Sequence, residues 1–442
     1  MRQATARIRC DSLRDVEPLD HVLWQKVKIR EIGKVVTGMT PPTKHQAYYG
    51  DDYLFVTPSD LDFDSYIVSK TERCISKQGY EKYSNRFIPA MSTMYTCIGS
   101  TIGKIGLCRE TVLTNQQINS IIPNDVHDAK FVYYLMRSQT NEIRALNAGC
   151  AVPIINKGDF ENIDVLLPPL PIQRRIADIL SAYDDLIENN RRRIAILEET
   201  ARLTYRKWFG GVMKSDGGMR HETIDEPEVG REARDARRVS SLASHARVMR
   251  LMSHAHPRTA TLGEICREVR RGVSPDAIAP DTPYIGLEHM PRRSISLCEW
   301  ESAQKVTSTK LAFEAGDILF GKIRPYFHKV GITFVDGVAS SDAIVIKPLR
   351  HELHAYVLMT VSSDAFVAAA SQGMKEGSKM PRADWKQLLN YSVAMPGDDT
   401  LAEFNKVLNP ILEQLKTLCF SIRNLAAARD MLLPRLMKGD AA

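Results

Sequence analysis

Two long stretches of the chain repeat apolar residues at every seventh position, each with a companion stripe. In the first stretch, residues 172–209, the stripes are Leu180, Ile187, Ile194, Ala201 and Trp208, with Ile176, Tyr183, Asn190, Leu197 and Thr204. In the second stretch they are Leu408, Leu415, Ile422, Arg429 and Leu436, with Phe404, Ile411, Leu418, Leu425 and Leu432. Heptad positions a and d have this spacing, so each stretch is predicted to be one long helix.

A helix over residues 172–209 would be about 57 Å long, and a small domain cannot bury so narrow an apolar seam along that length. The second stretch is therefore expected to pair with the first as the spacer of the molecule. The alternative is a pair of ordinary amphipathic helices in separate domains. Asn190 either fixes the register of the pair or is a tolerated polar residue, and Pro410 is expected to kink the second helix or to mark where its regular part starts.

Short apolar runs broken by Gly, Pro and Asp precede each helix, and they repeat in order along the chain. Gly38 and Gly272, each followed three residues later by a proline, match at an offset of 234 residues. The offset is then 225 for the pairs Lys104/Lys329, Gly106/Gly331 and Pro123/Pro348, and 228 for Pro168/Pro396 and the helices. Such a collinear series indicates an internal duplication.

The pattern predicts an α+β protein with two globular α/β domains, each followed by a long helix. The two helices are expected to form an antiparallel coiled coil with pseudo-two-fold symmetry. The predicted segments are an N-terminal segment 1–23, a first domain 24–167, a helix 168–209, an Arg-rich linker 210–257, a second domain 258–395 and a helix 396–439.

Composition adds modest constraints. Lys and Arg (59) exceed Asp and Glu (53), which gives a net charge of +6 that permits a nucleic-acid partner without requiring one. The eight cysteines have no CxxC spacing and are expected to be reduced. The N-terminus lacks the apolar core of a signal peptide, and no apolar run of about 18 residues suggests a membrane span, so a cytoplasmic location is predicted.

Motifs for catalysis are not found. The run Gly99–Lys104 is one residue short of a phosphate-binding loop and is followed by Ile105, so a turn at a strand end is expected instead. His254 and His256 in the linker have no further ligands nearby in the sequence. The sequence therefore predicts no catalytic residue and no metal site, and favours a binding protein.

Basic, aromatic and amide residues in the globular halves suggest contacts with DNA. The run Lys322–Lys329 interleaves basic and aromatic residues, and Asn115–Asn119 supplies amides of the kind that pair with adenine. For each of these residues taken alone, a solvated surface side chain is the simpler interpretation. The candidate DNA contacts are Thr40, Lys44, Lys104, Gln116, Gln117, Arg270, Arg271, Lys322, Arg324, Tyr326 and Lys329.

Two runs carry a family resemblance. Leu166–Leu180 with Tyr205–Phe209, and Leu401–Asn405 with Arg429–Gly439, resemble the central and distal conserved regions of type I restriction-modification specificity subunits. The prolines after Gly38 and Gly272 resemble the start of each target recognition domain in that family. The long Arg-rich linker departs from the family pattern, where a short join is expected.

The resemblance implies a non-catalytic subunit in which each target recognition domain reads one half of a bipartite, asymmetric site in double-stranded DNA. It implies that the helices dock two modification subunits, which bind S-adenosylmethionine and methylate adenine, and that ATP- and Mg²⁺-dependent restriction subunits join them. One alternative is a specificity partner of a methyltransferase in a phage-defence system without restriction. Another is a nuclease with an unrecognised site.

Overall fold

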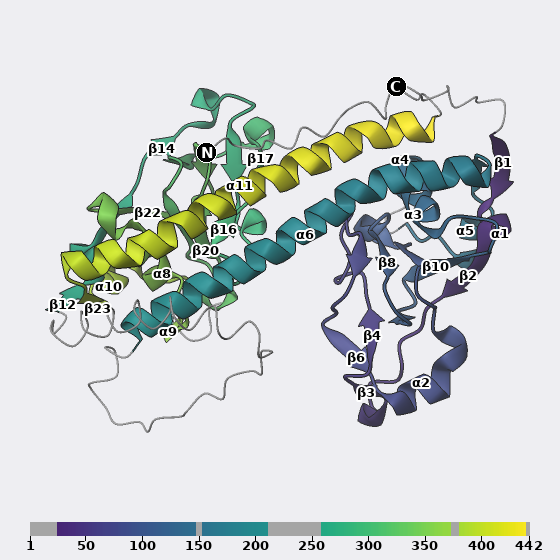
Figure 1. Ribbon diagram of the computed structural model, residues 1–442, viewed down its shortest axis with the longest axis horizontal. Coiled ribbons are helices and arrows are strands. Elements are labelled where there is room, and N and C mark those ends of the chain that lie inside the picture. Colours follow the sequence, from purple (N-terminus) through teal and green to yellow (C-terminus); the bar gives the residue numbers. More distant parts are fainter. Residues whose placement is uncertain (1–23, 147–152, 211–257, 373–379, 439–442) are drawn as a thin grey trace, which may run out of the picture. The chain divides into compact units, whose positions relative to one another are not determined.

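The computed structural model describes residues 24–146, 153–210, 258–372 and 380–438 (Figure 1). They form two compact units. Unit 1 contains the described residues up to Glu188 together with those from Arg423, and unit 2 spans Asn189–Ile422. The predicted N-terminal segment and linker residues 211–257 lie outside the described residues, as does residue 439 at the predicted end of the second helix.

Unit 1 is built on a five-stranded central sheet. Its strands, in spatial order, are β2 (Gly33–Thr37), β10 (Ile118–Pro123), β7 (Thr93–Thr96), β8 (Ile105–Cys108) and β5 (Ile67–Val68). Neighbours are antiparallel except β5 and β8, which are parallel. Helix α3 (Ala129–Ser138) contacts β7 and β8 through a run of buried residues, so the core lies between this helix and the sheet.

Further elements surround this core. A four-stranded sheet runs in the order β3 (Tyr49–Gly50), β6 (Arg73–Ile75), β4 (Tyr53–Val56) and β9 (Leu113–Thr114), and β1 (Gln25–Lys28) pairs with β11 (Asp164–Leu167). The shorter helices of the unit are α1 (Ile29–Ile32), α2 (Lys77–Tyr83), α4 (Thr140–Leu146) and α5 (Lys157–Glu161).

Unit 2 has the same plan. Its central sheet runs in the order β13 (Cys266–Val269), β22 (Ala343–Pro348), β19 (Ile318–Gly321), β20 (Val330–Thr333) and β16 (Ser296–Leu297). Its second sheet is β14 (Gly272–Val273), β18 (Lys310–Phe313), β21 (Gly337–Ala339), β15 (Pro283–Ile285) and β17 (Glu301–Ser302). Strand β12 (Arg258–Thr261) pairs with β23 (Ser392–Met395), and the shorter helices are α8 (His354–Val361), α9 (Asp364–Gln372) and α10 (Trp385–Leu388).

These bounds confirm the duplication. Strands β7, β8 and β10 recur as β19, β20 and β22 at an offset of 225, and β11 recurs as β23 at 228. The strands that precede Gly38 and Gly272 recur at an offset of 233. Pro123 pairs with Gly33 and the equivalent Pro348 pairs with Cys266, which sets the offset there at 233. Gly38 and Gly272 lie just beyond these strands, so their predicted offset of 234 leaves one additional residue in the turn of unit 2.

The two units differ most in their second sheets. In each, a central strand (β4 or β15) has a parallel neighbour (β9 or β21) and an antiparallel one (β6 or β17). Unit 2 adds β18 and β14 beyond β21, whereas unit 1 adds β3 beyond β6. The duplicated frame is thus preserved in the central sheet and altered in the sheet beside it.

The long helices are α6 (Leu170–Phe209) and α11 (Asp398–Met437), whose bounds differ by 228 at both ends. Helix α11 continues through Pro410, so the interpretation that the proline marks its start is wrong. A proline inside a helix removes one backbone hydrogen bond. The neighbouring Leu408, Ile411 and Leu412 are buried, and their burial offsets that loss.

The two helices pack antiparallel within each unit, as the internal duplication with pseudo-two-fold symmetry predicts. In unit 1 the first half of α6 meets the last half of α11, where Asp184 contacts Arg429 and Ile176 shares a core with Leu433. In unit 2 the roles are exchanged, and Trp208 contacts Phe404. The predicted seam residues are all buried or half-buried: Leu180, Ile187, Ile194, Leu197, Leu408, Leu415, Ile422 and Leu425.

The polar seam residue Asn190 is buried, and its side-chain amide donates to Ser421 Oγ at 3.1 Å across the helix pair. A slip of either helix would break this bond and leave the buried amide without its partner. The contact therefore favours the interpretation that Asn190 fixes the register.

The expectation that every cysteine is reduced is wrong for one pair. Cys298 and Cys419 form a disulfide with their Cα atoms 5.1 Å apart, beside the contact of Trp300 with Phe420. The two residues are separated by 121 positions, so sequence spacing could not pair them. Cys74, Cys97, Cys108 and Cys266 are free thiols, and Cys10 and Cys150 lie outside the described residues.

Helix α8 is buried from Ala355 to Val361 and contacts β20 and β22. In the described part of the chain, no single helix has both the length and the apolar character needed to cross a membrane. One pair bent by 64°, His351–Val361 with Asp364–Gln372, meets that test by length and composition.

Candidate nucleic-acid interface

The predicted DNA contacts all lie in loops at one edge of a central sheet. In unit 1, β2 and β7 end at this edge and the antiparallel β8 and β10 begin there. In unit 2, β13 and β19 end at the corresponding edge, where β20 and β22 begin. We call this side of each central sheet its loop edge. It contains Thr40, Lys44, Lys104, Gln116 and Gln117 in unit 1, and Arg270, Arg271, Lys322, Arg324, Tyr326 and Lys329 in unit 2.

In unit 1 the loop after β2 lies against the turn before β10. Thr40 Oγ1 donates to Gln116 Oε1 at 2.7 Å, and the Met39 amide donates to Thr114 O at 2.8 Å. A side chain at Gly38 would bring its Cβ within 2.1 Å of Thr114 O, so this close approach requires glycine. Lys44 and Gln116 are exposed, and the two loops together present a polar surface.

The amide run Asn115–Asn119 divides into exposed and structural residues. Asn115 Oδ1 accepts from the Gln117 backbone amide at 3.0 Å and shapes the turn. Asn119 is buried, where its Oδ1 accepts from Thr37 Oγ1 at 2.6 Å and its Nδ2 donates to Cys97 Sγ. Gln116 is exposed and Gln117 is half-buried, so Gln116 presents its amide most openly at the loop edge.

Lys104 and Lys329 occupy equivalent positions and make equivalent bonds. Lys104 Nζ donates to Pro58 O at 3.1 Å, and Lys329 Nζ donates to Leu287 O at 2.5 Å. Each acceptor lies two residues after the equivalent strand, β4 or β15. Burial lowers the pKa of the Lys329 ammonium, with a smaller contribution from Arg292. Both ammonium groups thus tie the loop edge to the second sheet, and their contact with DNA stays a prediction.

The loop edge of unit 2 is richer in cations. Arg270 Nε lies 2.7 Å from Glu268 Oε1, and Arg271 lies 2.5 Å from Glu314. Hydrogen bonds from Lys347 and Arg271 lower the pKa of the Glu314 carboxyl to about 2. Arg270 and Arg271 are exposed, so exchanging these carboxylates for phosphate oxygens would need no change in the fold.

The run Lys322–Lys329 forms the loop between β19 and β20 at this edge. Phe327 has the guanidinium of Arg292 4.1 Å from its ring centroid and that of Arg324 at 5.9 Å, while Tyr326 is 52% exposed. Stacking of arginine on an aromatic ring holds the planar guanidinium in a defined orientation.

Arg382 is a residue of this edge that the sequence did not single out. It lies at the loop because Ile323 and Arg382 form an isolated β-bridge, and its guanidinium is 3.2 Å from Asp342. Ile98 and Ile154 form the equivalent bridge in unit 1. The repeat relates the two bridges to each other. The sequence does not reveal either bridge, because the pairing of the two segments is a tertiary contact.

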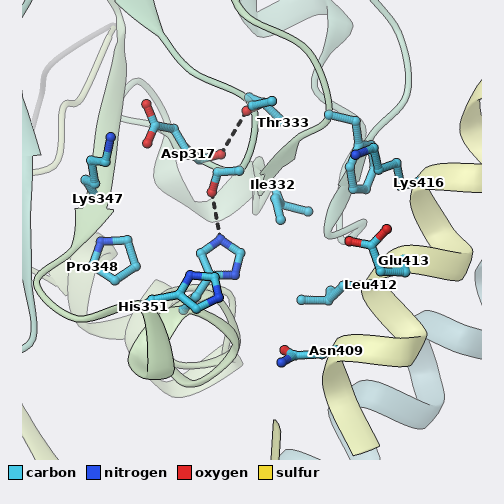
Figure 2. Close-up of a pocket in the computed structure, with 14 residues that line it drawn as sticks. Asp317, Ile332, Thr333, Lys347, Pro348, His351, Asn409, Leu412, Glu413 and Lys416 are labelled. Atoms are coloured by element: carbon cyan, nitrogen blue, oxygen red, sulfur yellow. Dashed lines mark hydrogen bonds between the residues drawn. The ribbon is translucent and has the colours of Figure 1, made fainter. Parts of the chain in front are cut away.

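Cavities lie at both edges of the unit 2 sheet. One of about 560 Å³ is lined by Arg270, Lys322, Arg382 and Lys386 among others and belongs to the loop edge. Another of about 500 Å³ lies at the opposite edge, beside α11, and contains none of the predicted DNA contacts. Figure 2 shows this second cavity, in which Thr333 Oγ1 donates to Asp317 O. His354 Nε2 lies 2.7 Å from Gly316 O.

The polar groups of the second cavity mostly support its own walls. Burial raises the pKa of the Asp317 carboxyl, which accepts from the Glu314 amide at 2.9 Å. Across the residues that the structure describes, no group of three or more His, Cys, Asp or Glu side chains is arranged to hold a metal ion.

Known proteins resemble this chain over most of its length. The family model "Type I restriction modification DNA specificity domain" matches residues 21–199. The MjaIX specificity subunit of a type I restriction enzyme from Methanocaldococcus jannaschii is 24% identical over 94% of this chain and 93% of that protein. The HindI specificity subunit from Haemophilus influenzae is 30% identical over 38% of each chain.

A solved structure supports the fold. The S subunit of a type I restriction-modification system from M. genitalium superposes with a TM-score of 0.55 and 15% identity, over 95% of this chain and 99% of that one. The family model reaches the first domain and most of α6, whereas the full-length likenesses extend to unit 2.

Proposed function

This chain belongs to the family of type I restriction-modification specificity subunits, and we propose that each of its units reads one half of a bipartite DNA site with its loop edge. The observation that carries this proposal is the duplicated edge. Equivalent strand ends in both units present loops of different sequence, Thr40 and Gln116 in one and Arg270 and Arg324 in the other. Different side chains on one frame fit an asymmetric target.

The two edges also differ in the chemistry they offer to DNA. The exposed Gln116 amide of unit 1 can pair with an adenine edge, while the arginines of unit 2 suit guanine or phosphate oxygens. The second half-site is therefore expected to contribute more of the salt-dependent affinity than the first.

The paired helices are proposed to set the spacing of the half-sites and to dock two modification subunits. Their seam is buried, yet Ile196 and Leu203 of α6 are 66% and 54% exposed. Apolar residues that stay exposed on a helix already paired with another helix are suited to contact a further protein. The modification subunits would bind S-adenosylmethionine and methylate adenine, and restriction subunits would supply ATP- and Mg²⁺-dependent cleavage.

In this proposal the chain itself contributes binding and no catalytic group. Sequencing of genomic methylation in a host with and without the gene, with the modification subunit present, tests it. The expected result is that one bipartite methyladenine motif disappears with the gene. An unchanged methylome, or turnover by the purified chain alone with DNA, Mg²⁺ and S-adenosylmethionine, would contradict it.

A further inference from the structure

The disulfide between Cys298 and Cys419 joins the central sheet of unit 2 to helix α11. Cys298 directly follows β16, the edge strand of that sheet, and Cys419 is fully buried on α11. Beside the disulfide, the rings of Trp300 and Phe420 meet edge to face with their centroids 6.0 Å apart. The cross-link therefore holds the edge of the sheet on the helix.

The same segment is also bound to α6 without a covalent bond. The Glu198 carboxylate is buried, and its Oε1 accepts from Ser294 Oγ at 2.7 Å. The backbone amides of Ile295 and Ser296 donate to the same oxygen at 3.1 and 3.0 Å. Ile295 and Leu297 are buried in the core of the unit. Since these contacts do not involve sulfur, unit 2 is expected to stay folded when the disulfide is reduced.

Comparison of the two units shows that the duplicated frame folds without this cross-link. Strand β16 recurs in unit 1 as β5 at an offset of 229, so the residue equivalent to Cys298 is Ser69. At the helix offset of 228, the residue equivalent to Cys419 is Arg191. Strand β5 nevertheless occupies the same edge of its central sheet. The cysteine pair is therefore an addition to unit 2 and not a requirement of the fold.

The two cysteines differ in their access to solvent. Cys298 is half-buried, whereas Cys419 is fully buried, so a small thiol in solution can reach the sulfur of Cys298 first. An accessible cysteine beside a second one that can displace its adduct is typical of reversible redox sites. Other thiols of the chain are less reactive, because burial raises the pKa of Cys97 and Cys266 to about 12 and that of Cys108 to about 11.

We infer that Cys298 and Cys419 are a redox-sensitive modification site, which locks the central sheet of unit 2 on α11 when oxidised and releases this lock when reduced. The inference goes beyond the proposed function and does not depend on it.

The oxidant is a low-molecular-weight disulfide such as oxidised glutathione, and the reaction has two steps. The Cys298 thiolate attacks the glutathione disulfide, forms a mixed disulfide and releases one glutathione thiolate. The Cys419 thiolate then attacks Cys298 Sγ, which closes the internal disulfide and releases the second glutathione thiolate. Two protein thiols are thereby oxidised, one glutathione disulfide is reduced to two thiols, and the two protons pass to the leaving thiolates.

Oxidation is expected to stabilise the folded chain. The two cysteines are 121 positions apart, and a cross-link over so long a segment restricts the unfolded chain. The oxidised full-length chain is therefore expected to melt about 5–10 °C above the reduced chain. Hydrogen exchange of the backbone amides of residues 294–298 is expected to be slower in the oxidised chain, because this segment is then fixed to both helices.

The purified full-length chain tests the site directly. It is equilibrated in glutathione buffers from oxidising to reducing, quenched with acid and alkylated after denaturation, and each cysteine is followed by peptide mass spectrometry. Cys298 and Cys419 are expected to change together from blocked to alkylated, and the melting temperature of the same samples is expected to fall in step. Alkylation of both cysteines in every oxidising buffer would overturn the inference, as would equal melting temperatures of the oxidised and reduced chains.

Two variants assign the effect to this pair. Cys298→Ser places in unit 2 the residue that unit 1 has at Ser69, and it is expected to melt at the temperature of the reduced wild-type chain in every buffer. Cys74→Ser is the matched control, since Cys74 is a half-buried free thiol, and it is expected to keep the full difference between oxidised and reduced chains. A difference that persists in Cys298→Ser, or disappears in Cys74→Ser, would overturn the inference. None of these measurements requires DNA, so failure of the proposed function would leave their outcome unchanged.

Discussion

Asp184 and Arg429 form a buried ion pair that joins α6 to α11 in unit 1. Both are at most 2% exposed, Asp184 Oδ2 also accepts from Tyr134 OH at 2.6 Å, and Arg429 Nε donates to Asp430. At the repeat offset of 228 the equivalent residues of unit 2 are Leu412 and Ala201, which are buried and apolar. At the positions equivalent to the ion pair of unit 1, unit 2 therefore has an apolar pair.

Replacing Asp184 with leucine is expected to reduce the free energy of unfolding by about 3–5 kcal/mol, since Arg429 keeps its charge in a buried site. The double variant Asp184→Leu with Arg429→Ala reproduces the unit 2 residues and is expected to recover most of that loss. Denaturant unfolding of the full chain measures both. Equal stability of the single and double variants would show that the buried charge is not the cause.

His328 gives the chain a predicted dependence on pH. Burial lowers the pKa of its imidazole below the ordinary 6.5; the hydrogen bond with Ser362 O and the charge of Asp364 oppose this shift, while Arg293 and Arg202 add to it. Because the unfolded chain takes up this proton first, the stabilisation is present above about pH 6.5 and declines as the pH falls below it. The melting temperature is therefore expected to fall between about pH 7.5 and pH 5.5.

His328 has left-handed backbone with a φ of 54°. His328→Asn serves as the matched variant for this effect, because asparagine tolerates this conformation and does not titrate. Its melting temperature is expected to fall less than that of the wild type over the same pH interval. An identical fall in both chains would assign the effect to other groups.

At the scale of whole elements, the seam of the long helices tests the heptad interpretation. Leu408 is fully buried in the core of unit 2, and Leu408→Ala is expected to cost about 2–5 kcal/mol of unfolding free energy. Leu203→Ala is the control, since Leu203 is 54% exposed on the partner helix and its loss should change stability by no more than about 0.5 kcal/mol. Thermal and denaturant unfolding measure both variants. A similar loss of stability in the two would contradict the assignment of Leu408 to the buried seam.

The helices were predictable because buried apolar residues recur at the a and d positions over many turns, so that many residues indicate the same helix. Their bounds could be predicted to within two residues by the offset of 228. Pro410 does not end the helix, because its helix-breaking preference is outweighed by the burial of the residues around it. The disulfide between Cys298 and Cys419 was not predictable, because it depends on tertiary proximity alone.

The candidate site was predictable in part. Gly, Pro, basic and aromatic residues identified the loops, and the topology shows why those loops share one edge. The sequence could not separate the structural Lys104 and Lys329 from the exposed Arg270, because the difference lies in the direction of a side chain, which the tertiary fold sets. Arg382 was missed for the same reason: a β-bridge with Ile323 brings it to the loop.

At the scale of the whole molecule, the duplication separates what is shared from what differs. Strands β7, β8 and β10 of the central sheet and the long helices keep their bounds at fixed offsets, whereas the second sheets and the loop edges diverge. Each loop edge is formed entirely by its own unit. Recognition of the two half-sites is therefore expected to be independent.

Exchange of residues 24–165 for the same segment of another family member tests this independence. It replaces the loop edge of unit 1 and leaves α6, α11 and the loop edge of unit 2 in place. Methylome sequencing of a host carrying the hybrid should show a motif altered in one half, with the other half and the gap unchanged. The reciprocal exchange of residues 258–395 should alter the other half, and because Arg324 lies in that segment, it should also change the salt dependence of binding. A hybrid that changes both halves would show that the edges read DNA jointly.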